Sequence, residues 1–485
     1  MPGAAAWKLA GGPSSGQSGP VVDSYDVLVV GAGPAGTVAA LRAAELGARV
    51  AVIEAGPPGG TCVNTGCVPT RVLAKIARLM REVRTADAYG ISVTEQHLDW
   101  PTTVARVRAT VERVRAVKGD ASRLAAAGVD LLQGRARFVS PHELDVRADD
   151  GATRRVRGES IILCVGGHSR RLPVPGAELA TMPEGVLDLP ELPRRVAVIG
   201  AGNTGAQLVT VFNAFGSEVI LLEVAPRILA QADADVSAHV HKAFREQSVR
   251  VVVGIDAVEL LEPAADGIRL AWRSNGRGCD VVADVVVMCT GWPAAIEELG
   301  LEAAGIESTG SRIPVDEYLA TNVGHVYVAG DANGVAMLVQ AANAEAEAAA
   351  RNAVLGTTVR APHHLLPAGG FTDPDYADVG LTEDGARERD GRCVVALVAY
   401  DELERPVIDD RPRGFLKLIA DRRREHLLGA HAVGENAVEV IQAVTTAMAA
   451  GVDVATLAKV EFAYPTYSAA IGVAARRLLE VPAVH

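Results

Sequence analysis

The chain contains the same strand, glycine turn, helix and strand unit twice, and this repeat constrains its fold more than any other feature. Each unit has a Gly-x-Gly-x-x-Gly turn after a β-rich run and an acid 23 positions after the first glycine. The residues are Gly31, Gly33, Gly36 and Glu54 in the first unit and Gly200, Gly202, Gly205 and Glu223 in the second. Such a turn presents backbone N–H groups to a pyrophosphate at a helix N-terminus. The repeat therefore predicts two dinucleotide-binding units.

The acids suggest which nucleotides bind. A carboxylate at the end of the second strand accepts hydrogen bonds from a ribose. Glu223 should bond a 2′-hydroxyl and repel a 2′-phosphate, so the second unit is expected to prefer NADH to NADPH. No arginine follows Glu223 directly, although Arg227 lies near it in sequence. The alternative interpretation is a solvated acid at the end of a strand.

Residues 59–71 place two cysteines five positions apart shortly after the first unit. In a regular helix Cys62 and Cys67 would lie about 7.5 Å apart along the axis, beyond the roughly 4.4–6.8 Å Cα separation of a disulfide. The turn that carries them must therefore be distorted. Gly66 supplies the backbone freedom, and Pro69 suits the first turn of the following helix. A thiolate near a helix N-terminus has a lowered pKa and is a good nucleophile.

Composition narrows the function. Six cysteines in 485 residues are too few for a secreted disulfide framework, so the close pair is redox-active or metal-binding. A second pair with ligand spacing is missing, which argues against zinc; no metal site is expected. The formal charge of −12 would repel a phosphate backbone, so nucleic acid is not expected as a partner. The sequence has no 18-residue apolar run and no recognisable signal peptide. We therefore expect no membrane partner and a cytoplasmic location.

Helical and β-rich patterns fill the rest of the chain. Apolar residues recur at helical spacing in 71–86 and in 104–117. Beyond the second unit, β-rich stretches are expected at 249–254, 268–273 and 282–289 and a helix at about 335–355. After a Pro/His/Gly linker at 361–370, strands around 393–399, 414–420 and 426–433 and helices at 436–451 and 468–480 predict a separate α+β domain.

Taken in order over about residues 24–482, these motifs resemble the class I flavoprotein disulfide reductases, the family of dihydrolipoamide dehydrogenase, glutathione reductase and mercuric reductase. The resemblance implies an α/β fold with two Rossmann-like dinucleotide-binding domains and a C-terminal α+β dimerisation domain, hence a homodimer with its active site at the subunit interface. Residues 1–23 are expected to form a disordered extension, because the first 20 are rich in Gly, Ser, Pro and Ala. The resemblance divides the rest into an FAD-binding domain at 24–155 and 290–360, an NAD-binding domain at 156–289, and the interface domain at 361–485.

The resemblance also implies the site residues. FAD and NADH would be held by Gly31, Gly33, Pro34, Ala35, Gly36, Glu54, Gly60, Thr61, Arg71, Ala136, Gly166, Gly200, Gly202, Asn203, Thr204, Gly205, Gln207, Glu223, Gly291, Gly330 and Asp331. Hydride would pass from NADH to the flavin, and electrons would then reduce the Cys62–Cys67 disulfide. By the same likeness Cys62 is the interchange thiol and Cys67 faces the flavin.

The sequence departs from the family pattern at the proton donor. Disulfide-reducing members carry a His-Pro motif followed by a glutamate, whereas this chain has Tyr464 and Ala469 at those positions. A phenol of pKa near 10 is poorly matched to proton transfer at pH 7. Reduction of a small disulfide is therefore expected to be slow, with Tyr464 acting as a hydrogen-bond donor or weak metal ligand. The alternative is a packed interface aromatic.

A second departure lies beside the flavin. The lysine and glutamate that normally pair there are replaced by Arg71 and Gln207. Because an arginine keeps its proton, Arg71 is expected to stay cationic and to stabilise the reduced flavin. The chain also ends without the cysteine pair that mercuric reductases use to receive the metal ion.

Three functions remain open. The favoured one is an NADH-dependent flavoenzyme that passes electrons through the dithiol to a metal ion, a quinone-like compound or an unusual disulfide. In the second, the dithiol is a nucleophile that cleaves or forms a carbon–sulfur bond, as in a lyase or carboxylase. In the third, the chain is a non-catalytic FAD-binding subunit.

Overall fold

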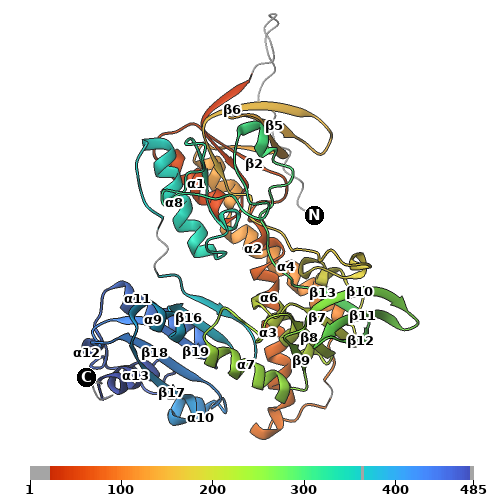
Figure 1. The fold of residues 1–485 in the computed structure, drawn as a ribbon, viewed down its shortest axis with the longest axis vertical. Coiled ribbons are helices and arrows are strands. Elements are labelled where there is room, and N and C mark those ends of the chain that lie inside the picture. The colour runs from red at the N-terminus through yellow and green to blue at the C-terminus, as the bar shows by residue number, and fades with distance from the viewer. Residues whose placement is uncertain (1–21, 95, 362–364, 481–485) are drawn as a thin grey trace, which may run out of the picture.

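The computed structural model describes residues 22–94, 96–361 and 365–480, and it separates them into three lobes, each built around its own sheets (Figure 1). The first nucleotide unit lies at the top, the second at the lower right and the C-terminal sheet at the lower left. All but the last two residues of the expected extension 1–23 lie outside the described residues.

The first lobe holds a seven-stranded mixed sheet in the order β3-β2-β1-β6-β5-β4, with β14 paired to β6. Its strands are β1 (Asp23–Val30), β2 (Val50–Glu54), β3 (Asp130–Gln133), β4 (Arg135–Ser140), β5 (Glu143–Arg147), β6 (Thr153–Leu163) and β14 (Val326–Val328). The alanine-rich helices α1 (Pro34–Glu45) and α8 (Val339–Leu355) pack against each other over one face. Small side chains let two helices approach closely, so this face is covered by a tight pair.

The second lobe holds a four-stranded parallel sheet, β13-β7-β8-β9, beside a three-stranded antiparallel sheet, β10-β11-β12. The parallel strands are β7 (Arg195–Ile199), β8 (Glu218–Glu223), β9 (Arg250–Val253) and β13 (Val285–Met288). The antiparallel strands are β10 (Ala257–Ala264), β11 (Gly267–Ser274) and β12 (Arg277–Ala283), and the helices are α6 (Asn203–Phe215) and α7 (Ala234–Glu246). This lobe confirms the second parallel α/β unit.

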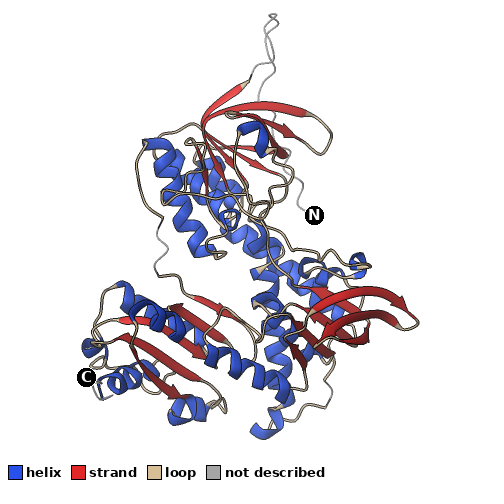
Figure 2. Cartoon of the chain, in the orientation of Figure 1, coloured by secondary structure: helices blue, strands red, loops and turns tan. Residues whose placement is uncertain are grey.

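The C-terminal lobe is an antiparallel sheet of order β15-β16-β19-β18-β17 with helices against it (Figure 2). Its strands are β15 (Ala368–Gly370), β16 (Tyr376–Gly380), β17 (Cys393–Ala399), β18 (Phe415–Asp421) and β19 (Leu427–Val433). Its helices are α9 (Glu383–Asp390), α10 (Glu404–Ile408), α11 (Ala437–Ala449), α12 (Val454–Leu457) and α13 (Ala469–Glu480). The predicted α+β character is confirmed.

Two long helices join the lobes. Helix α3 (Cys67–Arg84) lays Leu73 and Ala77 in one core with α6, and α4 (Trp100–Lys118) adds Val104 and Val107 to that core. Both helices were predicted from their apolar spacing. The polar face of α3 turns toward the C-terminal lobe.

A buried ion cluster ties the second lobe to the C-terminal sheet. The Nζ of Lys417 in β18 lies 2.9 Å from Asp233 and 2.7 Å from Asp235, at the start of α7, and 2.6 Å from Glu383 in α9. Lys417 and Asp233 are only 2% exposed. Burial alone would lower the pKa of Lys417, but its hydrogen bonds to the three acids raise it. The ammonium group therefore stays charged inside the molecule.

Within the part of the chain that the structure describes, no helix is both long enough and apolar enough to cross a membrane. The cytoplasmic location stays a prediction.

Candidate active site

The two glycine turns have nearly the same geometry. Gly31 has a φ of 102°, and a Cβ there would lie 2.4 Å from the Cys164 carbonyl oxygen; Gly200 has a φ of 97° and the equivalent distance to Cys289 is 2.3 Å. Both positions need glycine, because L side chains rarely adopt this backbone and have no room here. The turns lead directly into α1 and α6, so their free N–H groups point where a pyrophosphate would bind.

The strand-end acids fold back onto these turns. Glu54 accepts hydrogen bonds from the N–H of Ala32 at 2.5 Å and of Gly56 at 2.7 Å. Glu223 does the same with Ala201 at 2.6 Å and Ala225 at 2.8 Å. One N–H bond on each oxygen fixes the carboxylate and leaves lone pairs for ribose hydroxyls. Neither acid is simply a solvated strand end.

The cysteine segment is a broken helix, as its spacing requires. Helix α2 (Gly60–Asn64) ends before Gly66, whose φ of −110° and ψ of −107° are not helical, and α3 then begins at Cys67. The Gly66 N–H donates to the Thr61 carbonyl at 2.6 Å. The break brings the thiols of Cys62 and Cys67 within hydrogen-bonding distance of each other.

The two thiols differ in acidity. A hydrogen bond from Cys62 lowers the pKa of Cys67 to about 7 against the opposing effect of burial, while the same bond and burial raise the pKa of Cys62. Cys67 also occupies the first turn of an 18-residue helix, where the helix dipole favours an anion. The nearby charge of Lys118, at the end of α4, lowers both pKa values. One thiolate is therefore available at neutral pH.

Gly330 and Asp331 lie next to the first glycine turn, against helix α1. Gly330 packs against α1, since a Cβ there would lie 3.4 Å from the Ala35 Cβ, and its N–H donates to the buried Glu345 at 2.6 Å. The Trp292 indole N–H donates to the Asp331 carboxylate at 2.8 Å. Burial raises the pKa of Asp331, and the Trp292 bond opposes that rise. Trp292 thus helps to keep this partly buried carboxylate ionised.

Arg71 and Gln207 meet the same aromatic residue. The Arg71 guanidinium carbon lies 3.5 Å from the centre of the Phe371 ring, a stacking contact that suits a planar cation. The Gln207 side-chain oxygen accepts the Phe371 backbone N–H at 3.4 Å, and its amide donates to the Asn203 carbonyl at 2.9 Å. The substituted pair is bridged by Phe371. Stabilisation of the flavin by Arg71 stays a prediction.

Tyr464 lies in the C-terminal lobe, between α12 and α13, whereas the dithiol lies in α2 and α3. The tyrosine side chain is 77% exposed, just before α13, and the Tyr464–Pro465 peptide bond is cis. Any role at the dithiol would therefore have to be played across a subunit interface. Its catalytic role stays a prediction.

The structure brings together most of the residues implied for the first nucleotide. A Cβ on Gly60 would lie 2.7 Å from the Gly33 Cα, so the start of α2 closes on the first turn. Pro34 and Ala35 begin α1, and Thr61 lies in α2. Gly166 and Gly291 lie in the segments that follow β6 and β13, next to the isolated bridge between Gly167 and Ala294. Ala136 is buried in β4 within the core. In the second turn Gly202 precedes α6, and Asn203, Thr204 and Gly205 form its first turn.

Sequence reasoning missed Trp292, Phe371 and Lys118. Trp292 and Phe371 act through contacts with residues 39 and 300 positions away in the chain. A basic residue at the end of a helix, such as Lys118, gives no sign by itself of lying near a thiol.

Comparison with known proteins defines the class. Residues 25–346 match the pyridine nucleotide-disulphide oxidoreductase family and residues 366–475 match the dimerisation domain of that family. The chain belongs to this family of flavoprotein disulfide oxidoreductases, which are enzymes that use FAD and NAD(P)H. The dimerisation domain supports a homodimer.

The relatives that resemble this chain are named for different activities. A dihydrolipoyl dehydrogenase of Mycobacterium bovis is 33% identical over 92% of this chain and 96% of its own length. A mercuric reductase of Bacillus cereus is 31% identical over 91% of this chain and 69% of its own length. Among solved structures, the Cu(II) complex of the HOCl-induced flavoprotein disulfide reductase RclA from Escherichia coli has a TM-score of 0.83 and 26% identity, covering 94% of this chain and 100% of that one.

The residues of the first lobe fit FAD. The turn at Gly31 and Gly36 has no room for side chains, Glu54 is oriented by two backbone bonds, and Asp331 is a partly buried carboxylate held by one indole. Across the described residues, no group of three or more His, Cys, Asp or Glu side chains is arranged to hold a metal ion.

Proposed function

We propose that this protein is an NADH-dependent flavoenzyme that delivers electrons through Cys62 and Cys67 to a thiol-binding metal ion such as Cu(II) or Hg(II). The observation that carries the proposal is the combination of an intact dithiol, with one thiol of pKa about 7, and Tyr464 at the position of the acid–base histidine. FAD, when bound, supplies the relay between NADH and the dithiol.

The preference for NADH rests on Glu223 and Arg227. Glu223 is held at the end of β8, where it would repel a 2′-phosphate. The Arg227 guanidinium donates at 3.0 Å to the carbonyl oxygens of both Ala230 and Ala232, so it is already engaged by its own loop. A Glu223→Ala variant should therefore use NADPH better relative to NADH, by about tenfold in kcat/KM.

A metal acceptor suits this dithiol because it demands no proton from the protein. Two electrons leave the two sulfurs, an S–S bond forms, and two Cu(II) ions become Cu(I); the thiol proton of Cys62 is released to solvent. A small disulfide, by contrast, must receive a proton on its leaving sulfur. The names of the mercuric reductase and of the RclA copper complex support a metal acceptor here.

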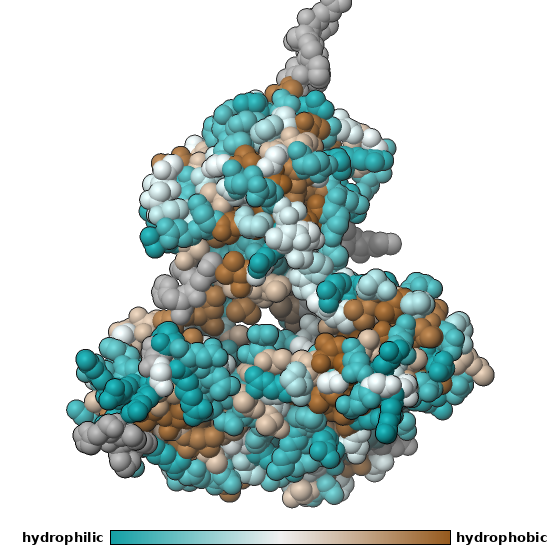
Figure 3. Space-filling model, viewed as in Figure 1, coloured by the Kyte–Doolittle hydropathy of each residue, from teal (hydrophilic) through white to brown (hydrophobic). Residues whose placement is uncertain are grey.

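In a homodimer, Tyr464 of one subunit would lie near the dithiol of the other. Large apolar side chains are exposed on the C-terminal lobe, among them Val407 at 58%, Ile408 at 63% and Tyr464 at 77%, and brown patches lie over that lobe in Figure 3. Pairing of two such lobes would cover these side chains and carry Tyr464 toward the partner's dithiol.

The test is steady-state NADH oxidation with Cu(II), Hg(II), a quinone and small disulfides as acceptors. Metal-dependent oxidation should exceed disulfide-dependent oxidation in the wild type and vanish in Cys67→Ser. The double variant Tyr464→His, Ala469→Glu should raise disulfide turnover by about 10²-fold. The single variant Ala469→Glu is the control. Fast disulfide turnover by the wild type would refute the proposal.

Other outcomes identify the alternatives. A carbon–sulfur product formed with the dithiol would indicate the lyase- or carboxylase-like function. No NADH oxidation with any acceptor would indicate a non-catalytic FAD-binding subunit.

A further inference from the structure

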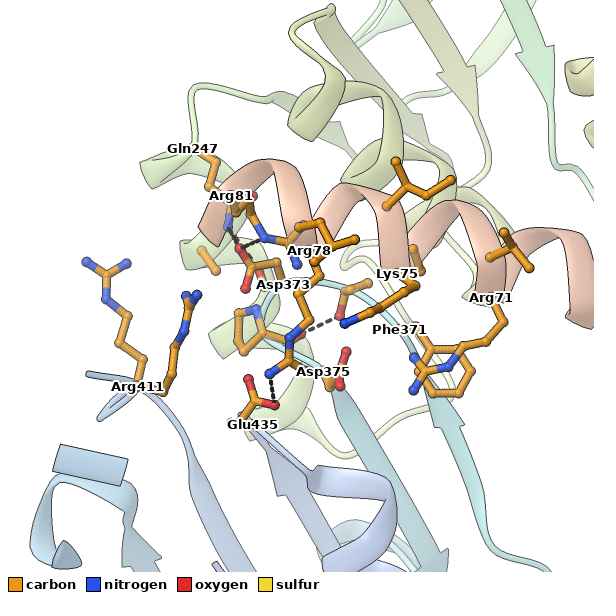
Figure 4. A pocket seen from close by; sticks show the side chains of 18 of the residues that line it. Arg71, Lys75, Arg78, Arg81, Gln247, Phe371, Asp373, Asp375, Arg411 and Glu435 are labelled. Atoms are coloured by element: carbon orange, nitrogen blue, oxygen red, sulfur yellow. Dashed lines mark hydrogen bonds and ion pairs between the residues drawn. The ribbon is translucent and has the colours of Figure 1, made fainter. Parts of the chain in front are cut away.

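A large cavity opens beside the dithiol on the face of α3 that turns away from α6. It has a volume of about 1310 Å³ and is bounded by α3, α4, the end of α7 and the loops of the C-terminal lobe near residues 371–375 and 410–413. Cys67 lies in its wall at one end. Figure 4 shows the basic side chains of α3 directed into it.

The lining is rich in cations. Seven basic residues line the cavity, compared with four acidic ones, Asp373, Asp375, Asp410 and Glu435. Three of the basic residues are paired: Arg78 with Glu82 and Glu435, Arg81 with Asp373, and Arg413 with Glu246. Paired charges largely cancel, so the character of the cavity depends on the other four.

Those four are Arg71, Lys75, Arg106 and Arg411. Among the described residues none of them has a carboxylate within ion-pair distance, and Arg71 instead stacks on Phe371. They come from α3, α4 and the C-terminal lobe, so the positive charge surrounds the cavity and does not lie along one exposed helix.

The acids do not neutralise this charge. Burial raises the pKa of Asp375 to about 7, despite the opposing charge of Arg71, so this carboxyl is only partly ionised at neutral pH. Nη1 of Arg81 is buried and, within the described part of the chain, has no hydrogen-bond partner. Arg81 thus keeps an unused N–H donor, although its charge is paired with that of Asp373. Because Glu435 and Asp373 are paired with Arg78 and Arg81, the four unpaired cations face only Asp375 and Asp410, which leaves an excess of positive charge in the cavity.

The spacing of the cations indicates the size of the ligand. Arg71 and Lys75, the two unpaired cations of α3, are four residues apart, which corresponds to about 6 Å along the helix. Arginine forks match phosphate and carboxylate groups, and lysine binds them as a point charge. A ligand with two or more such groups spread over this length would meet several cations at once.

We propose that this cavity is a binding site for a small polyanion that carries two or more phosphate or carboxylate groups, held by Lys75, Arg411 and Arg106 between α3 and the C-terminal lobe. This site is separate from the two nucleotide turns and goes beyond the proposed electron transfer. Its ligand is bound and not oxidised or reduced.

Isothermal titration of the FAD-loaded full-length protein with tripolyphosphate, at about 0.15 M salt, tests the site. We expect saturable binding of one tripolyphosphate per subunit, weakened at least tenfold in the double variant Lys75→Glu, Arg411→Glu. The control double variant Arg113→Glu, Arg245→Glu makes the same change in net charge at two exposed positions outside the cavity, and it should bind as the wild type does.

A milder pair keeps the test valid if charge reversal prevents folding. Lys75→Gln with Arg411→Gln should weaken binding at least threefold, while FAD content and NADH oxidation stay unchanged. Absence of saturable binding would overturn the proposal, and this is the result expected if the partner subunit fills the cavity in the dimer. Equal weakening in the control variant would overturn it as well, because binding would then follow net charge alone.

Discussion

The two nucleotide turns match in backbone and hydrogen bonding but differ in what faces them. A Cβ on Gly33 would meet the Gly60 Cα at 3.7 Å, whereas a Cβ on Gly202 would meet nothing within 4 Å. The start of α2 thus covers the first turn, and the second stays open. We therefore expect the covered turn to hold a cofactor that stays bound and the open turn to bind a substrate that exchanges.

Substituting the third glycine of each turn should show the largest difference between the functions of the two nucleotide lobes. A Cβ on Gly36 would lie 1.8 Å from the Gly31 carbonyl oxygen, and a Cβ on Gly205 would lie 1.9 Å from that of Gly200. We expect each alanine variant to lose about 3 kcal/mol of stability or more. Gly36→Ala should lack flavin, whereas Gly205→Ala should keep it and lose NADH oxidation. Flavin absorbance, thermal unfolding and NADH kinetics measure these effects, and loss of flavin in both would mean that the lobes are not independent.

The covering segment can be altered alone. Gly60 has a φ of 58° and its added Cβ would lie 2.7 Å from the Gly33 Cα, so Gly60→Ala should weaken FAD binding about tenfold, from a left-handed backbone cost of about 1–2 kcal/mol. Gly202→Ala, at the open turn, should change the KM for NADH less than about threefold. Equal effects on FAD and NADH would show that the cover has no role.

The hydrogen bond from Trp292 to Asp331 also acts on the first nucleotide site, because Asp331 belongs to the first lobe. Trp292→Phe removes the indole donor and should weaken FAD binding about fivefold to tenfold at pH 7, the value of a hydrogen bond to a charged group. Without that donor the pKa of Asp331 rises further, so FAD binding by the variant should fall at a higher pH than in the wild type as the solution is acidified. Titration of the apoprotein with FAD across pH is the measurement; an unchanged pH profile would contradict the proposed role.

The smallest expected effect concerns the thiols next to the covered turn. With a pKa of about 7 for Cys67, its alkylation by iodoacetamide should rise as pH increases from 6 to 8, with a midpoint near 7. Cys62→Ala removes the donating thiol and should move that midpoint upward. Cys164→Ala, a change at a buried cysteine, is the control. Mass mapping of Cys67 reports the rate, and a midpoint that stays in place would mean that the helix dipole alone sets the acidity.

Local patterns predicted much of this molecule. The glycine turns, the strand-end acids and the break at Gly66 depend on residues close in sequence, so their geometry follows from short-range rules. The contacts of Arg71 with Phe371 and of Trp292 with Asp331 join segments far apart in the chain, and periodicity carries no information about them. The basic face of α3 could be recognised in the sequence as polar, but only the fold shows that loops of the C-terminal lobe enclose it.

The ion cluster at Lys417 has a consequence for how the chain can be divided. Asp233 and Asp235 come from the second lobe, whereas Glu383 and Lys417 come from the C-terminal one. A cut between the lobes would separate a buried ammonium from two of its three carboxylates, and an unpaired buried charge is strongly destabilising. The C-terminal lobe is therefore not a detachable module, and the two lobes should unfold as one cooperative unit.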